Sequence, residues 1–376
     1  MKKTIYCLAE QALQFDLETD LRGGGELVYE NTIELLKAMG YDVTCFQFSH
    51  EKRVAKFRGH KIYGLGNISK PRAINGDYEK GIKEFISEAE KNNADGIYYL
   101  SMNLAMASTK IPSVVVSHGV FWNDYQKNDY VKPVDSLDMM KKAIRNSSRM
   151  ISCDTDTCHQ ISVWCPQFVN KLEYIPNYVD LNLFKPVQRK NDGIFRLIFP
   201  RRLDVARAFI TMEEAADILL EKFNNIEITF CGKGNDGETR QFNDWKSRKD
   251  NRIIHIIKEH DLMPLAYENK DLGMVPTLKC EGTSLSLLEL YASRIVPVTT
   301  WVGGLSDISI NNFISFVINP NDPVAIANIV EYAMQNPQKL EEMRENGQRF
   351  IKHFGKDRWE QSVKKVFIDT YGDPNE

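Results

Sequence analysis

Short runs of apolar residues alternate along the chain with longer stretches in which apolar residues recur three or four positions apart. The runs at Thr4–Ala9, Ser113–Ser117 and Phe195–Phe199 predict buried strands, because strands of a parallel sheet covered on both faces carry near-continuous apolar side chains. Stretches such as 27–39 and 356–371 predict amphipathic helices. This alternation of strand and helix predicts an α/β fold built on parallel sheets.

Length and linker composition predict two domains. A chain of 376 residues exceeds the usual size of one domain. Two prolines, Pro176 and Pro186, followed by the polar run 188–193, indicate a linker. We therefore expect a first domain over 1–186 and a second over 187–355.

Composition and charge indicate an ordinary globular protein. The chain is 43% hydrophobic and 26% charged, and its net charge of −3 argues against a nucleic-acid-binding protein. No apolar run is long enough to span a bilayer, and the N-terminal segment reads as a first strand rather than a secretion signal. Seven cysteines without disulfide-scaffold spacing favour a reducing cytoplasm.

The sequence offers no convincing metal site. The most closely grouped candidate ligands match no common zinc spacing: Cys153, Cys158, Cys165 and His159. Asp154 and Asp156 have the letters of an Asp-x-Asp metal motif, but their position predicts a helix N-cap instead. We expect neither a divalent metal nor a cofactor.

The most informative stretch runs from Glu281 to Gly304. Glu281 lies in a short loop after the apolar run 272–275, and Gly282-Thr283-Ser284 then opens a helix. The strand 295–300 and a Gly303-Gly304 turn follow. The N-terminus of a helix has unpaired N–H groups and a partial positive charge, so this stretch predicts a phosphate site.

Two glutamates flank the predicted phosphate site. Glu281 and Glu289 are eight residues apart, which corresponds to roughly 12 Å along a helix axis. This arrangement suits a ligand with hydroxyls at both ends and phosphates in the middle, as in a nucleotide diphosphate sugar. The alternative is an ordinary amphipathic helix with two solvated glutamates.

The Glu281-x7-Glu289 pattern with Gly303-Gly304 resembles the signature of retaining family 4 glycosyltransferases, which have the GT-B fold. Further similar segments follow the family's order along nearly the whole chain: Gly23-Gly24-x-Glu26, His118-Gly119, Ile175-Pro176-Asn177 and Gly232-x-Gly234. Each segment alone has a structural alternative, such as a glycine turn without a ligand or a histidine bonded to nearby backbone.

The resemblance also covers a cationic segment after the strand 195–199. There the family has a glycine-Arg-Leu stretch followed by Lys-Gly, and the Arg and Lys hold the donor diphosphate. Arg202 matches the Arg and Arg207 stands at the Lys position, whereas Arg201 replaces the first glycine. Since Arg is a planar fork rather than a point charge, the geometry around the phosphates must differ.

The resemblance implies two Rossmann-like domains facing a central cleft, with the last helix, within 356–376, crossing back to the first domain. The implied reaction moves a sugar from a nucleotide diphosphate sugar, such as a UDP-sugar, to an acceptor hydroxyl with retained configuration and without metal. The implied catalytic residues are Glu281, Arg202, Arg207 and His118. The implied substrate-binding residues are Gly23, Gly24, Gly232, Gly282, Thr283, Ser284, Leu285 and Glu289.

The stretch 50–72 carries seven basic residues and a single acid. It predicts either a solvated basic surface or a contact for an anionic acceptor or membrane headgroups at the inner face of a membrane. The acceptor itself stays open between a glycan, a glycolipid and a small molecule, in polysaccharide or glycolipid assembly. Two other functions stay open as well, a nucleotide-sugar epimerase of the same fold and a non-catalytic two-lobed nucleotide-binding protein.

Overall fold

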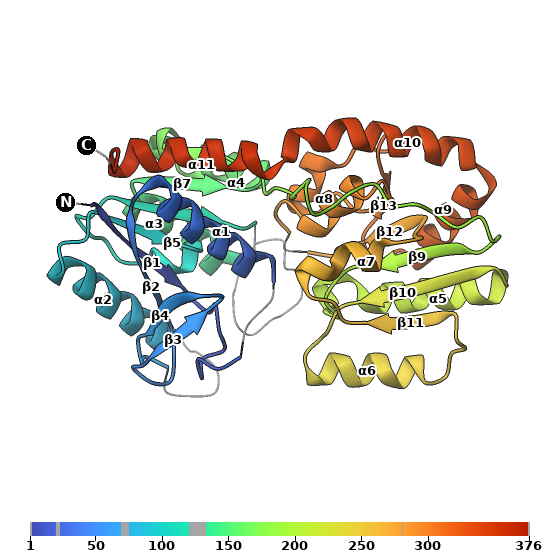
Figure 1. The fold of residues 1–376 in the computed structure, drawn as a ribbon, viewed down its shortest axis with the longest axis horizontal. Coiled ribbons are helices and arrows are strands. Elements are labelled where there is room, and N and C mark those ends of the chain that lie inside the picture. Colours follow the sequence, from blue (N-terminus) through green and yellow to red (C-terminus); the bar gives the residue numbers. More distant parts are fainter. Residues whose placement is uncertain (1, 20–22, 69–74, 120–132, 280, 375–376) are drawn as a thin grey trace. The chain divides into compact units, whose positions relative to one another are not determined.

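The structure is a computed structural model that describes residues 2–19, 23–68, 75–119, 133–279 and 281–374. The chain forms two compact α/β units (Figure 1). Unit 1 comprises Met1–Pro176 together with Trp359–Glu376, and unit 2 comprises Asn177–Arg358. The chain therefore passes between the units twice, and the sequence-based boundary near residue 186 lies further along the chain than the first crossing.

Unit 1 is built on an eight-stranded sheet in the order β3-β4-β2-β1-β5-β6-β7-β8. All neighbouring strands are parallel except β3 and β4, which form an antiparallel hairpin. The strands are β1 (Thr4–Ala9), β2 (Asp42–Gln47), β3 (Val54–Phe57), β4 (His60–Gly64), β5 (Gly96–Tyr99), β6 (Ser113–Ser117), β7 (Arg149–Ser152) and β8 (Leu172–Tyr174). Without the edge strands β3 and β8, this is the Rossmann strand order.

The helices of unit 1 come from both ends of the sequence. They are α1 (Gly24–Met39), α2 (Asn75–Lys91), α3 (Pro133–Asn146), α4 (Thr155–Trp164) and most of α11 (Lys356–Tyr371), with short 3-10 turns at Met102–Leu104 and Pro166–Lys171. The hydroxyl of Tyr371 donates to the carbonyl of Ile97, and the Phe367 ring meets Tyr98 edge-on at 6.0 Å. The predicted return of the last helix to the first domain is confirmed.

Unit 2 is built on a six-stranded, fully parallel sheet in the order β11-β10-β9-β12-β13-β14. The strands are β9 (Phe195–Phe199), β10 (Ile226–Cys231), β11 (Ile253–Ile256), β12 (Leu272–Val275), β13 (Val296–Thr299) and β14 (Phe316–Val317). This order of strands in the sheet is again that of the Rossmann fold. It places a topological switch point between β9 and β12, where open α/β sheets bind their ligands.

Helices cover both faces of the unit 2 sheet (Figure 1). They are α5 (Phe209–Lys222), α6 (Asp236–Lys246), α7 (Met263–Tyr267), α8 (Leu285–Ala292), α9 (Pro323–Gln335) and α10 (Pro337–Phe350). Short 3-10 turns lie at Val205–Arg207, His260–Leu262, Gly303–Ile308 and Ile351–Phe354.

The central strand β9 shows why the sequence has continuous apolar runs. Leu197 and Phe199 pack into the hydrophobic cluster on one face of the sheet, and Ile198 packs into the cluster on the other face. All three side chains are fully buried. Because neither face of the sheet meets water, every position of this strand is apolar and the period-two alternation of a half-exposed strand is absent.

The sequence pattern located the central strands well and one peripheral element poorly. The predicted strands at Thr4–Ala9, Ser113–Ser117 and Phe195–Phe199 are confirmed to the residue. The hairpin β3–β4 was not predicted, since its charged and apolar residues alternate at an exposed sheet edge and resemble a basic loop. Lys70 and Arg72 of that basic stretch lie outside the described residues.

Candidate functional site

A buried ion cluster lies at the switch point of unit 2, where β9 and β12 end side by side. Arg201 follows β9, and its guanidinium forms an ion pair with Glu281, in the loop after β12. The same guanidinium donates to Ser284 Oγ at 2.8 Å and lies 3.4 Å from Thr277 Oγ1. Arg201 thus joins the ends of the two strands to the start of α8.

Arg207 completes the cluster from the segment between β9 and α5. Its Nη1 lies 2.5 Å from Glu281 Oε2, and the hydroxyl of Thr277 donates to the same oxygen at 3.1 Å. Arg201, Arg207 and Thr277 all reach Oε2, so Oε1 is the atom of Glu281 that can accept a hydrogen bond from a ligand. The Nε of Arg201 is buried without a hydrogen-bond partner among the described residues.

Electrostatics keep this cluster charged. Burial opposes ionisation of Glu281, but Arg201 and Arg207 outweigh it and hold the pKa of its carboxyl below the usual range. Burial lowers the pKa of Arg201, an effect that Glu281 partly offsets. Two guanidinium groups against one carboxylate give the three side chains a net positive charge, which suits an anionic ligand.

Two glycines let the surrounding backbone close around the cluster. A Cβ on Gly303 would lie 2.1 Å from the carbonyl oxygen of Glu281, and Gly303 has a φ of +53° that disfavours other residues. A Cβ on Gly232 would lie 2.2 Å from the carbonyl oxygen of Arg201. The neighbouring Gly304 donates its N–H to the Glu281 carbonyl at 2.9 Å, so this turn fixes the Glu281 loop.

The N-terminus of α8 opens directly beside the cluster. Ser284 is the N-cap residue, but its hydroxyl does not cap the backbone and instead accepts from Arg201. The preceding Gly282 and Thr283 are buried, and Leu285, the first helical residue, is half-buried. The backbone N–H groups and partial positive charge of the helix therefore lie next to Arg201, as in an anion-binding site.

Glu289, the second glutamate of the pattern, lies on α8 and is also buried. It accepts from the hydroxyl of Tyr267 at 2.6 Å, and its Oε1 lies 3.3 Å from His260 Nε2. Burial opposes protonation of His260, but Glu289 outweighs it and raises the pKa of the imidazole. The sequence did not predict His260 or Tyr267 as neighbours of Glu289.

The two adjacent arginines after β9 have different environments. Arg202, which the family pattern assigns to the diphosphate, is exposed, and its side chain forms no hydrogen bond or ion pair with another described residue. Arg201, which stands in the place of a glycine, is the arginine buried against Glu281. Only the Arg-Arg pair at a strand end hinted at Arg201 in the sequence.

In unit 1 the predicted His118 lies at the end of β6. Its Nε2 is 2.7 Å from the Leu100 carbonyl, which can only accept, so Nε2 donates and Nδ1 is the unprotonated atom. Burial lowers the pKa of His118 and keeps the ring neutral. Gly23 is the N-cap of α1 and Gly24 its first residue, near the carboxyl end of β1.

A carboxylate that the sequence did not single out lies at the switch point of unit 1. Glu10 follows β1 and accepts from the hydroxyl of Tyr78 and from Asn103 Nδ2, the latter at 3.0 Å. Asn103 lies just after β5, the strand on the other side of the switch point. A polar residue directly after the first strand was the only sequence signal for this group.

The basic stretch 50–72 is partly neutralised within unit 1. Arg58 pairs with Glu30, Arg53 with Glu18 and Lys52 with Glu84, the last at 3.5 Å. Lys56 and Lys61 are exposed. These pairs favour the solvated-surface interpretation for at least half of the basic residues that the structure describes.

Two further sets of observations concern metal binding and membrane-spanning helices. Asp154 accepts from the Thr157 N–H at 2.6 Å and caps α4, which confirms the predicted N-cap. In the described ranges, no three His, Cys, Asp or Glu side chains are grouped closely enough to hold a metal ion. Of the described helices, none combines the length and the apolar character needed to cross a membrane.

Known proteins are similar to this chain in sequence and in fold. Residues 182–350 match the family model of glycosyl transferases group 1. This match lies within unit 2. An uncharacterized glycosyltransferase of Methanocaldococcus jannaschii is 22% identical over 201 residues, covering 52% of this chain and 57% of the relative. The match thus spans little more than half of that relative's length.

Solved structures match over the full length. Sucrose-phosphate synthase of Thermosynechococcus elongatus has a TM-score of 0.80 at 15% identity, covering 98% of this chain and 99% of the other. Anabaena HepE in complex with UDP-glucose has a TM-score of 0.75 at 16% identity, covering 97% and 99%. The lipopolysaccharide outer core galactosyltransferase WaaB has a TM-score of 0.71 at 12% identity, covering 97% and 99%. The predicted GT-B fold is confirmed.

Proposed function

We propose that this chain is a retaining glycosyltransferase that moves a hexose from a nucleotide diphosphate sugar to an acceptor hydroxyl. The observation that carries the proposal is the Arg201–Glu281–Arg207 cluster beside the N-terminus of α8, at the switch point of a group 1 domain. That arrangement combines donors for a diphosphate with an oriented carboxylate for sugar hydroxyls.

The chemistry follows from where charge develops. As the glycosidic bond to the donor breaks, negative charge grows on the departing diphosphate. Arg207, the exposed Arg202 and the backbone N–H groups of α8 would stabilise that charge in place, without reorganisation of solvent. Glu281 holds the two inner arginines through Oε2 and would accept from a sugar hydroxyl through Oε1.

We assign roles to the other predicted residues as well. Glu289 would accept from the ribose hydroxyls, and in the structure its carboxylate is held by Tyr267 and His260. Gly232 and Gly303 allow the close backbone approach that the diphosphate site needs. His118 in unit 1 would accept a sugar hydroxyl at Nδ1, and Gly23 and Gly24 would approach the substrate through backbone.

The names of the similar solved structures guide the choice of donor that we propose. HepE is a UDP and UDP-glucose complex, and WaaB is a galactosyltransferase. We therefore place a UDP-hexose first among donors and a glycan, glycolipid or small sugar first among acceptors, in polysaccharide or glycolipid assembly. The exposed Lys56 and Lys61 of the basic stretch remain the candidates for a peripheral membrane or anionic acceptor contact in the cytoplasm.

The first test is a thermal-shift screen of UDP-, GDP- and ADP-sugars, because a bound donor raises the melting temperature by mass action. The donor that binds is then incubated with acceptors in excess chelator, and the products are analysed by NMR. We expect release of free nucleotide diphosphate and a product with the donor's anomeric configuration. Inversion would contradict the retaining mechanism, and full loss of activity on chelation, restored by magnesium or manganese, would contradict metal independence.

Product analysis also separates the two alternatives. An epimerase interconverts nucleotide sugars without an acceptor. A non-catalytic binder produces a thermal shift without any product.

A further inference from the structure

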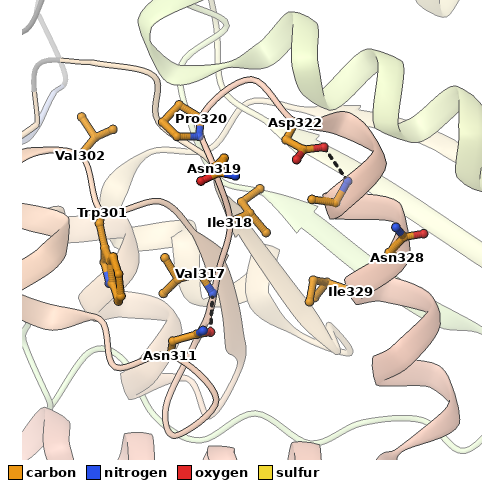
Figure 2. A pocket seen from close by; sticks show the side chains of 11 residues that line it. Trp301, Val302, Asn311, Val317, Ile318, Asn319, Pro320, Asp322, Asn328 and Ile329 are labelled. Carbon is orange, nitrogen blue, oxygen red and sulfur yellow. Dashed lines mark hydrogen bonds between the residues drawn. The ribbon is translucent and has the colours of Figure 1, made fainter.

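Unit 2 has a second concave region, away from the ion cluster. It has a volume of about 530 Å³ and lies beyond the carboxyl ends of β13 and β14, beside the first turns of α9 (Figure 2). A cavity of this size falls within the range of small-molecule sites. None of the predicted donor-site residues lines it.

An exposed indole forms one wall of the cavity. Trp301 lies two residues after the end of β13, and its side chain is 59% exposed. Figure 2 shows its ring at one side of the group of lining residues, with Val317 next to it and Ile318 further in. Because the indole is exposed at the edge of a concave region, its apolar face is available to a ligand that enters the cavity.

Amide and carboxylate groups provide the polar part of the lining. Asn319 and Asn328 are exposed, and Asn328 lies on α9. Asn311 accepts from the Val317 N–H at 3.0 Å through Oδ1, which leaves its NH₂ to donate. Asp322 caps α9 by accepting from the Ala325 N–H at 2.8 Å through Oδ1, which leaves Oδ2 to accept.

The charge of the lining distinguishes this cavity from the ion cluster. Of the described residues that line it, none is Lys or Arg, and Asp322 is the one acid. A phosphate or other anion would meet no cation here and one carboxylate. The cavity therefore favours a neutral ligand with both an apolar face and many hydroxyls.

From these observations we infer that the cavity binds a neutral saccharide, with one pyranose ring stacked on Trp301. The C–H face of a pyranose is apolar and fits an aromatic ring, while its hydroxyls pair with amides and carboxylates. The amides of Asn319 and Asn328 and the carboxylate of Asp322 supply these partners.

The cavity and the proposed donor site share a short backbone connection. Trp301 and Val302 lead directly into Gly303-Gly304, and Gly304 donates to the Glu281 carbonyl at 2.9 Å. A saccharide held at Trp301 therefore lies close to the loop that carries Glu281. The inference goes beyond the proposed donor site and rests on different residues, so either one can fail alone.

The test uses the whole 376-residue chain labelled with nitrogen-15. The indole N–H signal of Trp301, assigned by its loss in Trp301→Ala, is followed by NMR while maltotriose, cellotriose or mannotriose is added, and UDP is added in a separate titration. We expect at least one trisaccharide to shift this signal in a saturable way. Asn328→Ala should weaken that affinity at least fivefold, because it removes an exposed amide without disturbing a described hydrogen bond.

The matched control is Trp164→Ala in unit 1, since Trp164 is 52% exposed and lies outside the cavity. Trp164→Ala should leave trisaccharide affinity unchanged, whereas Trp301→Ala should abolish binding measured by calorimetry and Trp301→Phe should restore part of it. If Trp301→Ala does not fold, Trp301→Phe and Asn328→Ala decide the question.

Three results would overturn the inference. They are the absence of any saturable shift with all three trisaccharides, unchanged trisaccharide affinity in Trp301→Ala, and a Trp301 shift caused by UDP rather than by saccharide. Failure of UDP to bind, with trisaccharide binding intact, would instead count against the proposed donor site alone.

Discussion

At the scale of single residues, the two arginines after β9 have different roles in the proposed donor site. Arg201 is buried, holds Glu281 and has one unpartnered Nε, so we interpret it as a positioning residue. The Arg202 side chain is exposed, has no partner among the described residues and is available to a diphosphate. The two positions differ by burial rather than by residue type, which makes them a matched pair.

We expect Arg202→Gln to weaken donor affinity roughly 10- to 100-fold, since a charge-assisted hydrogen bond contributes about 1.5–3 kcal/mol. Its melting temperature should stay at the wild-type value. Arg201→Gln should instead lower the free energy of unfolding by about 3 kcal/mol, because it breaks a buried ion pair. Urea unfolding and donor titration of both variants measure the two effects. Equal loss of stability in the two variants would contradict this division.

The His260–Glu289 pair predicts a pH dependence. The pKa of His260 is raised in the folded protein, so the pair's stabilisation is fully present below the unfolded pKa of about 6.5 and is lost as pH rises through the folded pKa. Glu289→Gln should lower the pKa of His260, since burial is then opposed only by the neighbouring Asp261. NMR titration of the His260 ring measures the change. Tyr267→Phe, which removes the other bond to Glu289, is the control and should keep the His260 pKa raised.

At the scale of elements, the loop after β12 and the turn after β13 define the site together. Neither is regular structure, and their contact is made through backbone at Gly303 and Gly304. The sequence predicted the Gly-Gly turn and the Glu281 loop separately. Their contact depends on β12 and β13 being parallel neighbours, which aligns their carboxyl ends.

Gly303→Ala should therefore distort the Glu281 loop. Its Cβ would lie 2.1 Å from the Glu281 carbonyl, in addition to the strain of a positive φ. We expect a loss of at least about 3 kcal/mol in unfolding free energy together with loss of donor binding. Gly193→Ala is the control, because Gly193 has a φ of +77° but nothing within 4 Å of an added Cβ. It should cost only about 1–2 kcal/mol and leave donor binding intact.

At the scale of the whole molecule, the chain starts in unit 1, builds unit 2 and returns to unit 1 with α11. The stability of unit 1 thus depends on residues at the far end of the sequence. Phe367 is fully buried against Tyr98, and its neighbour Ile368 is 43% exposed.

Phe367→Ala should lower the stability of unit 1 by about 3–5 kcal/mol, whereas Ile368→Ala should cost less than about 1 kcal/mol. Hydrogen exchange followed peptide by peptide checks this. We expect faster exchange in β1 and β5 of the Phe367→Ala variant, with β9 and β12 of unit 2 unchanged. Equal acceleration in both units would mean that they unfold as one cooperative body.

The amino-acid sequence by itself determined the central strands, the α/β class and the family resemblance. These features depend on local apolar runs and on residues close together in the chain, whereas the return of the last helix was implied only by the resemblance. Local patterns also identified Glu281 and Glu289 as candidates, from a position after a strand and a fixed helical spacing, and the resemblance added Arg207.

Only the tertiary structure decided which side chains meet. Arg201 reaches Glu281, and Glu10 meets Asn103, because parallel strands distant in the sequence end at the same edge of a sheet. The fold also buries Arg201 while it leaves Arg202 exposed, and it brings His260 to Glu289. Most of the described basic residues of 50–72 form ion pairs with acids that are distant in the sequence. The charge and spacing of residues along the sequence do not predict these contacts, because the contacts form only when the strand order brings distant residues within a few ångströms.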